Sequence, residues 1–156
     1  MEESTLIFIK PDGVQRMLVG RIISKFEDKG LRLRGLKLLQ LTRAKAEEHY
    51  AIHKGKPFYD GLIRYVTSSP IVAMVWSGVR AIDVCRKLMG ATFGWKAEPG
   101  TIRGDFGISG SFNLVHGSDS PESAKTEIPI YFAASELVDW EPSVKSWVYD
   151  VKDDLK

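Results

Sequence analysis

Cysteine, long apolar runs and excess charge are all scarce in this sequence. Cys85 is the single cysteine among 156 residues, which excludes an intrachain disulfide and favours a reducing compartment. No apolar run approaches the ~18 residues of a membrane-spanning helix. The acidic segment 1–5 does not resemble a secretory signal. We therefore expect a cytoplasmic protein that does not enter a membrane.

The charge balance is nearly even. The sequence has 22 Lys and Arg residues against 20 Asp and Glu residues, a net charge of +2. This excess is too small to favour a nucleic-acid scaffold, although it is compatible with a local basic site for an anionic ligand. We expect no sequence-specific nucleic-acid partner.

Several functional motifs are absent or incomplete. No GxxxxGK[ST] segment is present, which excludes a P-loop nucleotidase. Asp105-Phe106-Gly107 matches the metal-binding triplet of protein kinases, but the chain is too short for that fold and lacks its other loops. Segment 103–107 is also a poor match to the RNA-binding strand of an RRM, because Asp105 interrupts it. His49 and His53 lie four residues apart, but no third ligand is apparent, so we expect them on a partly exposed helix face.

The order of predicted elements indicates the fold. With 44% hydrophobic and 27% charged residues, the chain has the composition of one globular domain, 1–156. Apolar spacing and turn signals predict strands at 6–9, 31–41 and 71–76, a strand that ends at His116, and helices at 19–26, 44–53, 58–67, 82–89 and 121–128. This is a βαβ pattern that occurs twice, so we expect an α+β, ferredoxin-like split βαβ sandwich with a four-stranded antiparallel sheet.

Local signals add finer expectations. A phase slip in the alternation of strand 31–41 predicts a β-bulge at Gly35. Cys85 falls on the apolar face of its helix and is expected in the core. Lys10–Gly13 is expected to form a turn, and Pro129 to end the last helix early. The tail 131–156, which contains Trp140, Trp147 and Tyr149, is expected to pack across the body or against a neighbouring subunit.

Segment 113–119, Asn-Leu-Val-His-Gly-Ser-Asp, places a histidine where a strand gives way to a helix. Gly117 is expected to break the strand, and Ser120-Pro121-Glu122 has the N-cap, proline and acid typical of a helix start. A neutral imidazole, with an unperturbed pKa of ~6.5, can act as a nucleophile at neutral pH. Ser118 and Glu127 are suitable partners to fix its tautomer. The alternative is a loop histidine with a purely structural hydrogen bond.

Four polar residues could bind phosphate. Lys10 ends a strand, Arg86 lies on a helix, and Thr92 and Arg103 flank a loop. Arginine binds phosphate oxygens in pairs, and lysine supplies a point charge. Taken singly, each of these cations is better interpreted as a solvated surface residue.

The chain resembles the nucleoside diphosphate kinase family from about Thr5 to Asp150, which leaves 151–156 as a C-terminal extension. The matching segments are Ile9–Arg16, Glu48–Tyr50, Pro57–Leu62, Ala73–Trp76, Pro99–Phe106, Asn113–Asp119 and Glu136–Trp140. The resemblance implies a broad-specificity enzyme that passes the γ-phosphate of a nucleoside triphosphate to a nucleoside diphosphate in two steps, through a phosphohistidine on the pros nitrogen of His116. It also implies Mg²⁺ held largely by the nucleotide phosphates, and a homohexamer.

The resemblance also implies roles for individual residues. Lys10, Arg86, Thr92 and Arg103 would hold the phosphates, and Asn113 would bind the ribose 3′-hydroxyl near Lys10. Tyr50 would lie close to His116, while Ser118 and Glu127 orient its ring. The base would lie against Phe58 and Leu62, where stacking on an aromatic ring tolerates any base.

The chain departs from the family pattern in two places. Phe93-Gly94-Trp95-Lys96 stands where the family usually has Asn-Pro, in a loop that contributes to subunit contacts. Ser111-Phe112 replaces Gly-Arg, and Gly110 stands where a larger apolar residue often helps hold the base. These changes bear on assembly and base contacts and remove no catalytic residue. A binding module without turnover is the alternative, and a steep loss of affinity with salt would distinguish a nucleic-acid binder from the enzyme.

Overall fold

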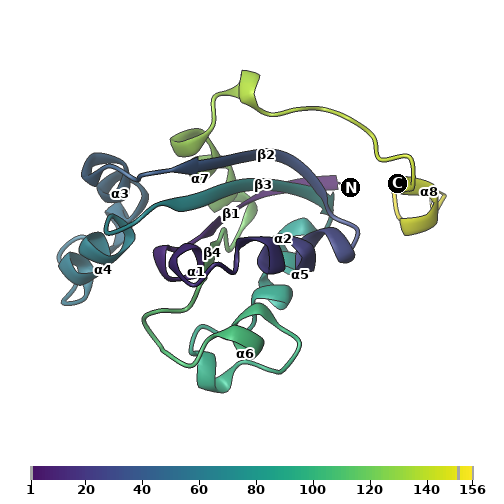
Figure 1. The fold of residues 1–156 in the computed structure, drawn as a ribbon. Helices are drawn as coiled ribbons and strands as arrows, with labels where there is room; N and C mark the ends of the chain where they lie inside the picture. Colours follow the sequence, from purple (N-terminus) through teal and green to yellow (C-terminus); the bar gives the residue numbers. More distant parts are fainter. Residues whose placement is uncertain (1, 151, 156) are drawn as a thin grey trace.

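The computed structural model describes residues 2–150 and 152–155, so the predicted C-terminal extension lies partly outside the described residues. The strands are β1 (Glu2–Ile9), β2 (Arg32–Leu39), β3 (Ile71–Val79) and β4 (Val115–Gly117). They form one antiparallel sheet in the order β2-β3-β1-β4 (Figure 1). The expected four-stranded antiparallel sheet with covering helices is confirmed.

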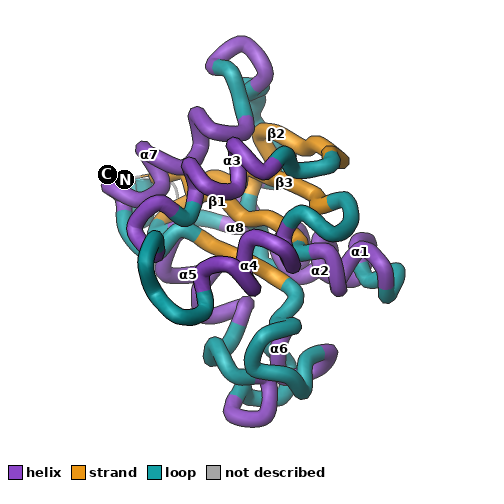
Figure 2. Tube along the Cα trace, turned by 90° about the vertical axis from the view of Figure 1, so that its left-hand side faces the viewer, coloured by secondary structure: helices purple, strands orange, loops and turns teal. Residues whose placement is uncertain are grey.

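The α-helices are α1 (Pro11–Gln15), α2 (Val19–Asp28), α3 (Arg43–His49), α4 (Tyr59–Val66), α5 (Ala81–Met89), α6 (Ile102–Phe106), α7 (Pro121–Tyr131) and α8 (Lys145–Val148). Short 3₁₀ turns lie at Ala51–His53, Gly94–Lys96 and Ala134–Glu136. Helices α2 and α5 cover one face of the sheet, and α7 lies on the other (Figure 1). In the turned view, α6 and its loops project beyond the sheet (Figure 2).

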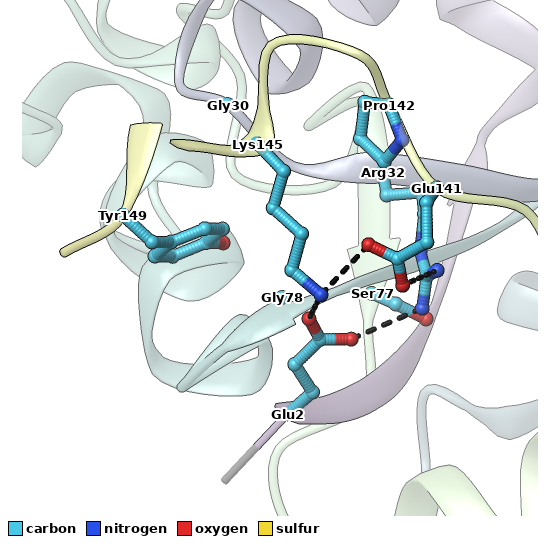
Figure 3. A pocket seen from close by; sticks show the side chains of 9 residues that line it. All are labelled: Glu2, Gly30, Arg32, Ser77, Gly78, Glu141, Pro142, Lys145 and Tyr149. Carbon is cyan, nitrogen blue, oxygen red and sulfur yellow. Dashed lines mark hydrogen bonds and ion pairs between the residues drawn. The ribbon is translucent and has the colours of Figure 1, made fainter. Parts of the chain in front are cut away.

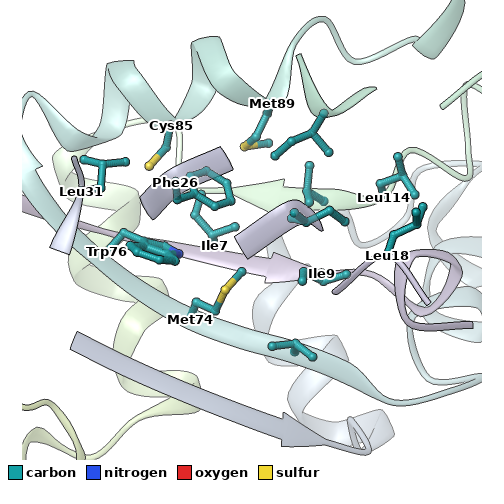
Figure 4. Packing of buried hydrophobic residues seen from close by; sticks show 14 of the residues in the cluster. Ile7, Ile9, Leu18, Phe26, Leu31, Met74, Trp76, Cys85, Met89 and Leu114 are labelled. Atoms are coloured by element: carbon teal, nitrogen blue, oxygen red, sulfur yellow. The ribbon is translucent and has the colours of Figure 1, made fainter. Parts of the chain in front are cut away.

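Each face of the sheet has its own apolar core, because successive side chains of β1 point to opposite faces. Ile7 and Ile9 pack with Trp76 and the helix residue Cys85 beneath α2 and α5 (Figure 4). On the other face, Phe8 packs with residues of α3, α4 and α7. Strand β3 is buried on both faces over almost its whole length, as its continuous apolar run predicts. The expected core position of Cys85 is also confirmed.

The predicted bulge in β2 is confirmed. The pairing of β2 with β3 shifts between Leu33 and Gly35. A Cβ at Gly35 would lie 2.9 Å from the ring of Phe132, so the bulge also brings the backbone close to the other core layer.

Two expectations about breaks need correction. Gly117 is the last residue of β4, where it still pairs with Ile7, so the strand ends one residue later than predicted. Its lack of a side chain also allows close packing, since a Cβ there would lie 2.5 Å from the sulfur of Met89. Pro129 does not end α7, which continues to Tyr131. Proline removes a single N–H, and burial of Tyr131 in the core keeps the last turn in place.

Two short helices differ from the predictions. The expected turn at Lys10–Gly13 is the start of α1, with Pro11 at its first position. Helix α6 lies in the stretch before β4, where no helix is predicted. Its N-cap is Thr101, whose hydroxyl accepts a hydrogen bond from the Gly104 amide at 3.0 Å.

The C-terminal segment crosses the molecule beside the edge strand β2 and then reaches the start of β1 (Figure 1). The Val138 amide and the Trp140 indole donate to carbonyls of β2 at 2.9 and 2.8 Å. Farther along, Lys145 pairs with Glu2 and Glu141 at 3.0 and 2.8 Å (Figure 3). Packing of the tail across the body is thus confirmed for this part, whereas Trp147 is 90% exposed. No helix in the described residues is both long and apolar enough to cross a membrane.

Candidate active site

His116 lies at the centre of β4, opposite Phe8 of β1. Its ring stacks on that of Phe8, with centroids 4.8 Å apart. Its Nε2 lies 3.0 Å from Glu127 Oε2 on α7, and the Ser118 hydroxyl donates to the same oxygen at 2.6 Å. Ser118 therefore acts on the histidine through Glu127 rather than by direct contact.

The protonation of this pair follows from its surroundings. Burial lowers the pKa of His116 below its ordinary value, although Glu127 opposes the shift. Burial acts to raise the pKa of Glu127, but hydrogen bonds from His116 and Ser118 bring it below its ordinary value. At neutral pH the pair is a neutral imidazole that donates its Nε2 proton to a carboxylate. The lone pair is then on Nδ1, as a nucleophile requires.

The backbone just before His116 is bent and held from several sides. Leu114 has a φ of 72°, unusual for a residue other than glycine. The Lys10 amide donates to the Leu114 carbonyl at 2.8 Å, and Asp12 Oδ2 accepts from the Leu114 amide at 3.2 Å. Tyr65 donates its hydroxyl to the other oxygen of Asp12. Asp12 and Tyr65 are positioning residues that the sequence analysis did not find, although Asp12 lies in a matched segment.

Lys10 is buried at the end of β1. Its Nζ donates to Asn113 Oδ1 at 2.8 Å. Burial, and then the positive charge of Arg103, lower the pKa of Lys10 to about 8. Lys10 is therefore mostly charged at neutral pH while its surroundings oppose that charge, so a bound anion would relieve an existing cost.

Arg103 on α6 is also buried, and it holds the loop that leads into β4. Its guanidinium donates to three carbonyls, those of Asn113 at 3.0 Å, Gly90 at 3.0 Å and Val115 at 2.7 Å. Burial, and then the neighbouring Arg86, lower the pKa of Arg103 to about 10, which leaves it a cation at neutral pH. Two of its five N–H groups are not used in these bonds.

Most of the predicted site residues surround a cleft of about 270 Å³. Of the predicted residues, those that line it are Lys10, Tyr50, Leu62, Arg86, Thr92, Arg103, Asn113, His116 and Glu127. Arg86 donates to the Gly117 carbonyl at 3.3 Å, and the Asn113 amide donates to the Thr92 carbonyl at 3.1 Å. The fold thus brings together residues from widely separated parts of the sequence.

Two predicted residues lie outside the lining of this cleft. Ser118 is buried behind Glu127. Phe58 is 53% exposed at the start of α4, with its ring 5.3 Å from that of His53. Leu62, one turn farther along α4, does line the cleft, so Phe58 stands at its rim.

Tyr50 is buried, with its ring centroid 6.4 Å from that of His116. Its hydroxyl has no hydrogen-bond partner, and burial raises its pKa well above the ordinary value. The phenol is therefore a neutral donor beside the ring of His116.

The expectation for His49 is wrong. It is 8% exposed, and its ring centroid lies 4.5 Å from that of His116. The last turn of α3 faces inward because α3 packs against α7, and His49 lies with His116 and Glu127 rather than forming a ligand pair with His53. Burial, and then His116, lower the pKa of His49 to about 3, so it is neutral. Its position directly before Tyr50 in a matched segment is the signal that could have placed it here.

Comparisons with known proteins show the family of this chain. The family model described as "Nucleoside diphosphate kinase" matches residues 3–137. The chain is 56% identical to the nucleoside diphosphate kinase of Thermosynechococcus vestitus and 55% identical to that of Carboxydothermus hydrogenoformans, with 96% and 95% of this chain and 99% of each relative covered. A solved structure of a halophilic nucleoside diphosphate kinase from Halobacterium salinarum, in complex with CDP, superimposes with a TM-score of 0.93 at 47% identity, covering 96% of this chain and 99% of that one. This chain belongs to the nucleoside diphosphate kinase family.

Proposed function

We propose that this phosphotransferase carries the γ-phosphoryl group of a nucleoside triphosphate to a nucleoside diphosphate on Nδ1 of His116. The single observation that carries the proposal is the 3.0 Å contact between His116 Nε2 and Glu127, because it leaves the lone pair on the other ring nitrogen. The binding of CDP by the halophilic relative supports a nucleoside diphosphate as the acceptor.

The reaction divides into two displacements at one site. The Nδ1 lone pair attacks the γ-phosphorus, and the bond from phosphorus to the β,γ-bridging oxygen breaks, so the diphosphate leaves with that electron pair. Glu127 accepts the Nε2 proton in a hydrogen bond that strengthens as the ring gains positive charge. A terminal oxygen of a second diphosphate then attacks the phosphorus, and the N–P bond breaks to return the lone pair to Nδ1.

The protein's main task in such a transfer is alignment and charge neutralisation. Lys10, Arg86 and Arg103 line the cleft around His116, and Thr92 adds a hydroxyl. Asn113 Oδ1 accepts a hydrogen bond from the Lys10 ammonium at 2.8 Å. The two side chains together can contact the ribose 3′-hydroxyl. We place the base between Leu62 and the exposed ring of Phe58, where stacking accepts any base.

The residues present fit a nucleotide-bound Mg²⁺ better than a protein-bound one. Mg²⁺ takes oxygen ligands and commonly keeps substrate phosphates and waters. Two carboxylates line the cleft, Glu127 and Asp119, and Asp119 is the one that makes no hydrogen bond to His116. Its Oδ1 accepts a hydrogen bond from the Ser123 hydroxyl at 2.6 Å. We propose that the phosphates hold the ion and that Asp119 supports its waters. The ion would supply neutralisation of phosphate charge.

We further propose that residues 5–150 form one catalytic domain and that the protein acts in the cytoplasm as a homohexamer. The unpaired, buried Cys85 is compatible with a reducing compartment. Analytical ultracentrifugation at several protein concentrations gives the mass of the assembly and so tests the proposed homohexamer.

Initial rates test the proposed mechanism. ATP and dGDP are varied together, and double-reciprocal plots at several fixed dGDP concentrations are compared. Parallel lines are expected, because the first product leaves before the second substrate binds. Lines that intersect would show a ternary complex and contradict the covalent carrier. A protein that binds nucleotides without turnover would instead be a binding module.

A further inference from the structure

His49 makes little use of its polar atoms where it lies. Its Nδ1 is buried without a hydrogen-bond partner, and its Nε2 is 4.0 Å from Glu127 Oε1, beyond hydrogen-bond distance. A buried imidazole without partners costs stability, and an apolar side chain would fill this position without that cost. Nε2 is the nitrogen that faces Glu127, so it is the His49 atom that a ligand held between these side chains would use.

The neighbours of His49 supply the rest of a ligand set. His49, His116 and Glu127 each offer one ligand atom, and these atoms lie within 4.8 Å of one another. The hydrogen bonds from His116 and Ser118 both go to Oε2 of Glu127, so Oε1 is the oxygen that faces His49. Zn–N and Zn–O bonds of about 2.0–2.2 Å place ligand atoms roughly 3.5 Å apart, so small side-chain rotations would close the set.

The donor types select the metal. Two neutral imidazoles and one carboxylate suit Zn²⁺ and similar first-row ions, whereas Mg²⁺ prefers oxygen ligands alone. We propose that His49, His116 and Glu127 form a Zn²⁺ site whose occupation blocks phosphoryl transfer. The fourth coordination position would be open to the cleft, where water completes the shell.

The inhibitory effect rests on the proposed role of His116 and follows from the chemistry of its ring. Zn²⁺ takes the lone pair of a deprotonated nitrogen. Coordination at Nε2 therefore moves the ring proton from Nε2 to Nδ1, with no change in the charge of the imidazole. Nδ1 then has no lone pair with which to attack phosphorus.

The sequence offers a matched control. It contains three histidines, and the third, His53, is outside the cluster. His53 lies in the turn after α3, and its Nδ1 is 3.0 Å from Lys56 Nζ. His49→Gln and His53→Gln thus make the same chemical change in neighbouring positions, inside and outside the proposed site.

The first test measures metal binding alone, without nucleotide. The metal-stripped protein is titrated with Co²⁺ by absorption spectroscopy and with Zn²⁺ against a chromogenic chelator. We expect one ion per chain with the bands of nitrogen and oxygen ligation, more than about 100-fold weaker binding in His49→Gln, and no more than about twofold change in His53→Gln. Absence of binding, equal losses in both variants, or a cobalt–thiolate band from Cys85 would overturn the site.

The second test uses the unmodified chain, since a buried substitution can disturb folding. Zn²⁺ added before ATP and Mg²⁺ should prevent the gain of a phosphoryl group, and a chelator should restore that gain. A gain at the zinc-free rate with one Zn²⁺ bound per chain would contradict the proposal.

The two proposals fail in different ways. If the zinc-free protein accepts no phosphoryl group, the proposed function fails, and the cobalt titration still decides the metal site. If the zinc-free protein is phosphorylated and Co²⁺ does not bind, the metal site fails and the proposed function stands.

Discussion

A lysine side chain lies near each end of strand β1, and the two differ in the charge of their neighbours. At the start of the strand, Lys145 of the tail pairs with Glu2 and Glu141 at 3.0 and 2.8 Å, and its hydrogen bonds to Glu141 and Glu2 raise its pKa (Figure 3). At the end of the strand, Lys10 is buried against the neutral side chain of Asn113, and its pKa is lowered to about 8. Within residues 2–150 and 152–155, Lys10 has no carboxylate at ion-pair distance.

The contrast separates a structural charge from a functional one. Lys145 has its counter-charges inside the chain, so its ion pairs fasten the tail to the sheet. Lys10 keeps a charge that the protein does not neutralise, which suits it to an anion that arrives from outside. Arg103 combines both features, because its bonds to three carbonyls hold the loop while its charge adds to that of Lys10.

The largest effect on activity is expected from removal of the His116 imidazole, around which these positive charges lie. His116→Ala should lower the rate of phosphoryl transfer from ATP to GDP by at least about 10³-fold, because no other lining group can take its place as the carrier. Nucleotide affinity, measured by calorimetry, should change by only a few-fold, since Lys10 and Arg103 remain. Turnover close to that of the unmodified protein would remove His116 from its proposed role.

Arg103→Ala should reduce both stability and activity. It leaves the carbonyls of Gly90, Asn113 and Val115 without their donor, which should lower the free energy of unfolding by about 2–4 kcal/mol in urea titrations. We also expect a higher KM and a lower kcat, because a charge on the moving phosphate is lost. Arg86→Ala is the control: it breaks a single 3.3 Å bond, so it should lower activity with a smaller loss of stability. An unchanged kcat/KM in Arg103→Ala would place that residue outside the site.

The pH profile should show opposite trends for activity and stability on the alkaline side. Above about pH 8 Lys10 loses its proton in the folded protein, so kcat/KM should fall. Between about 8 and 10.5 the unfolded chain still holds that proton, so this lysine should make the folded state more stable as pH rises. Lys10→Met should abolish both trends, and their persistence in that variant would assign them to another group.

On the acid side, the lowered pKa of His116 keeps the ring neutral below the ordinary value of 6.5. The acid limb of kcat/KM should therefore lie below pH 6.5, and a limb above 6.5 would contradict the lowered pKa of His116.

The smallest effect is expected at the other end of β1. Lys145→Ala removes partly exposed ion pairs, which contribute little to stability, so the melting temperature should fall by about 2 °C or less and kcat/KM should not change. A change in kcat/KM would show that the tail influences the cleft and would weaken the separation between the two lysines.

Features fixed by local pattern could be predicted from the sequence. The alternation in β2 locates the bulge at Gly35, and the apolar run of β3 indicates its burial on both faces. Pro129 misleads because its effect depends on tertiary packing: the core holds Tyr131 and so keeps the last turn of α7 in place.

The candidate site shows the same division between features set by local sequence and features set by tertiary packing. The motif around His116 and its partner Glu127 could be read from the chain, and the cations could be chosen only through the family resemblance. His49 could not be placed, because the inward direction of the last turn of α3 depends on α7, about 70 residues farther along. Asp12 and Tyr65 act by supporting the backbone at Leu114, whose positive φ angle no sequence pattern predicts.

The most direct measurement is the intact mass of the protein after brief mixing with ATP and Mg²⁺ at neutral or alkaline pH. The account predicts a gain of one phosphoryl group, ~80 Da, that is absent in His116→Ala and disappears when GDP is added. Nucleotide binding without any gain in mass, or a gain that persists in His116→Ala, would contradict the central claim that His116 carries the phosphoryl group.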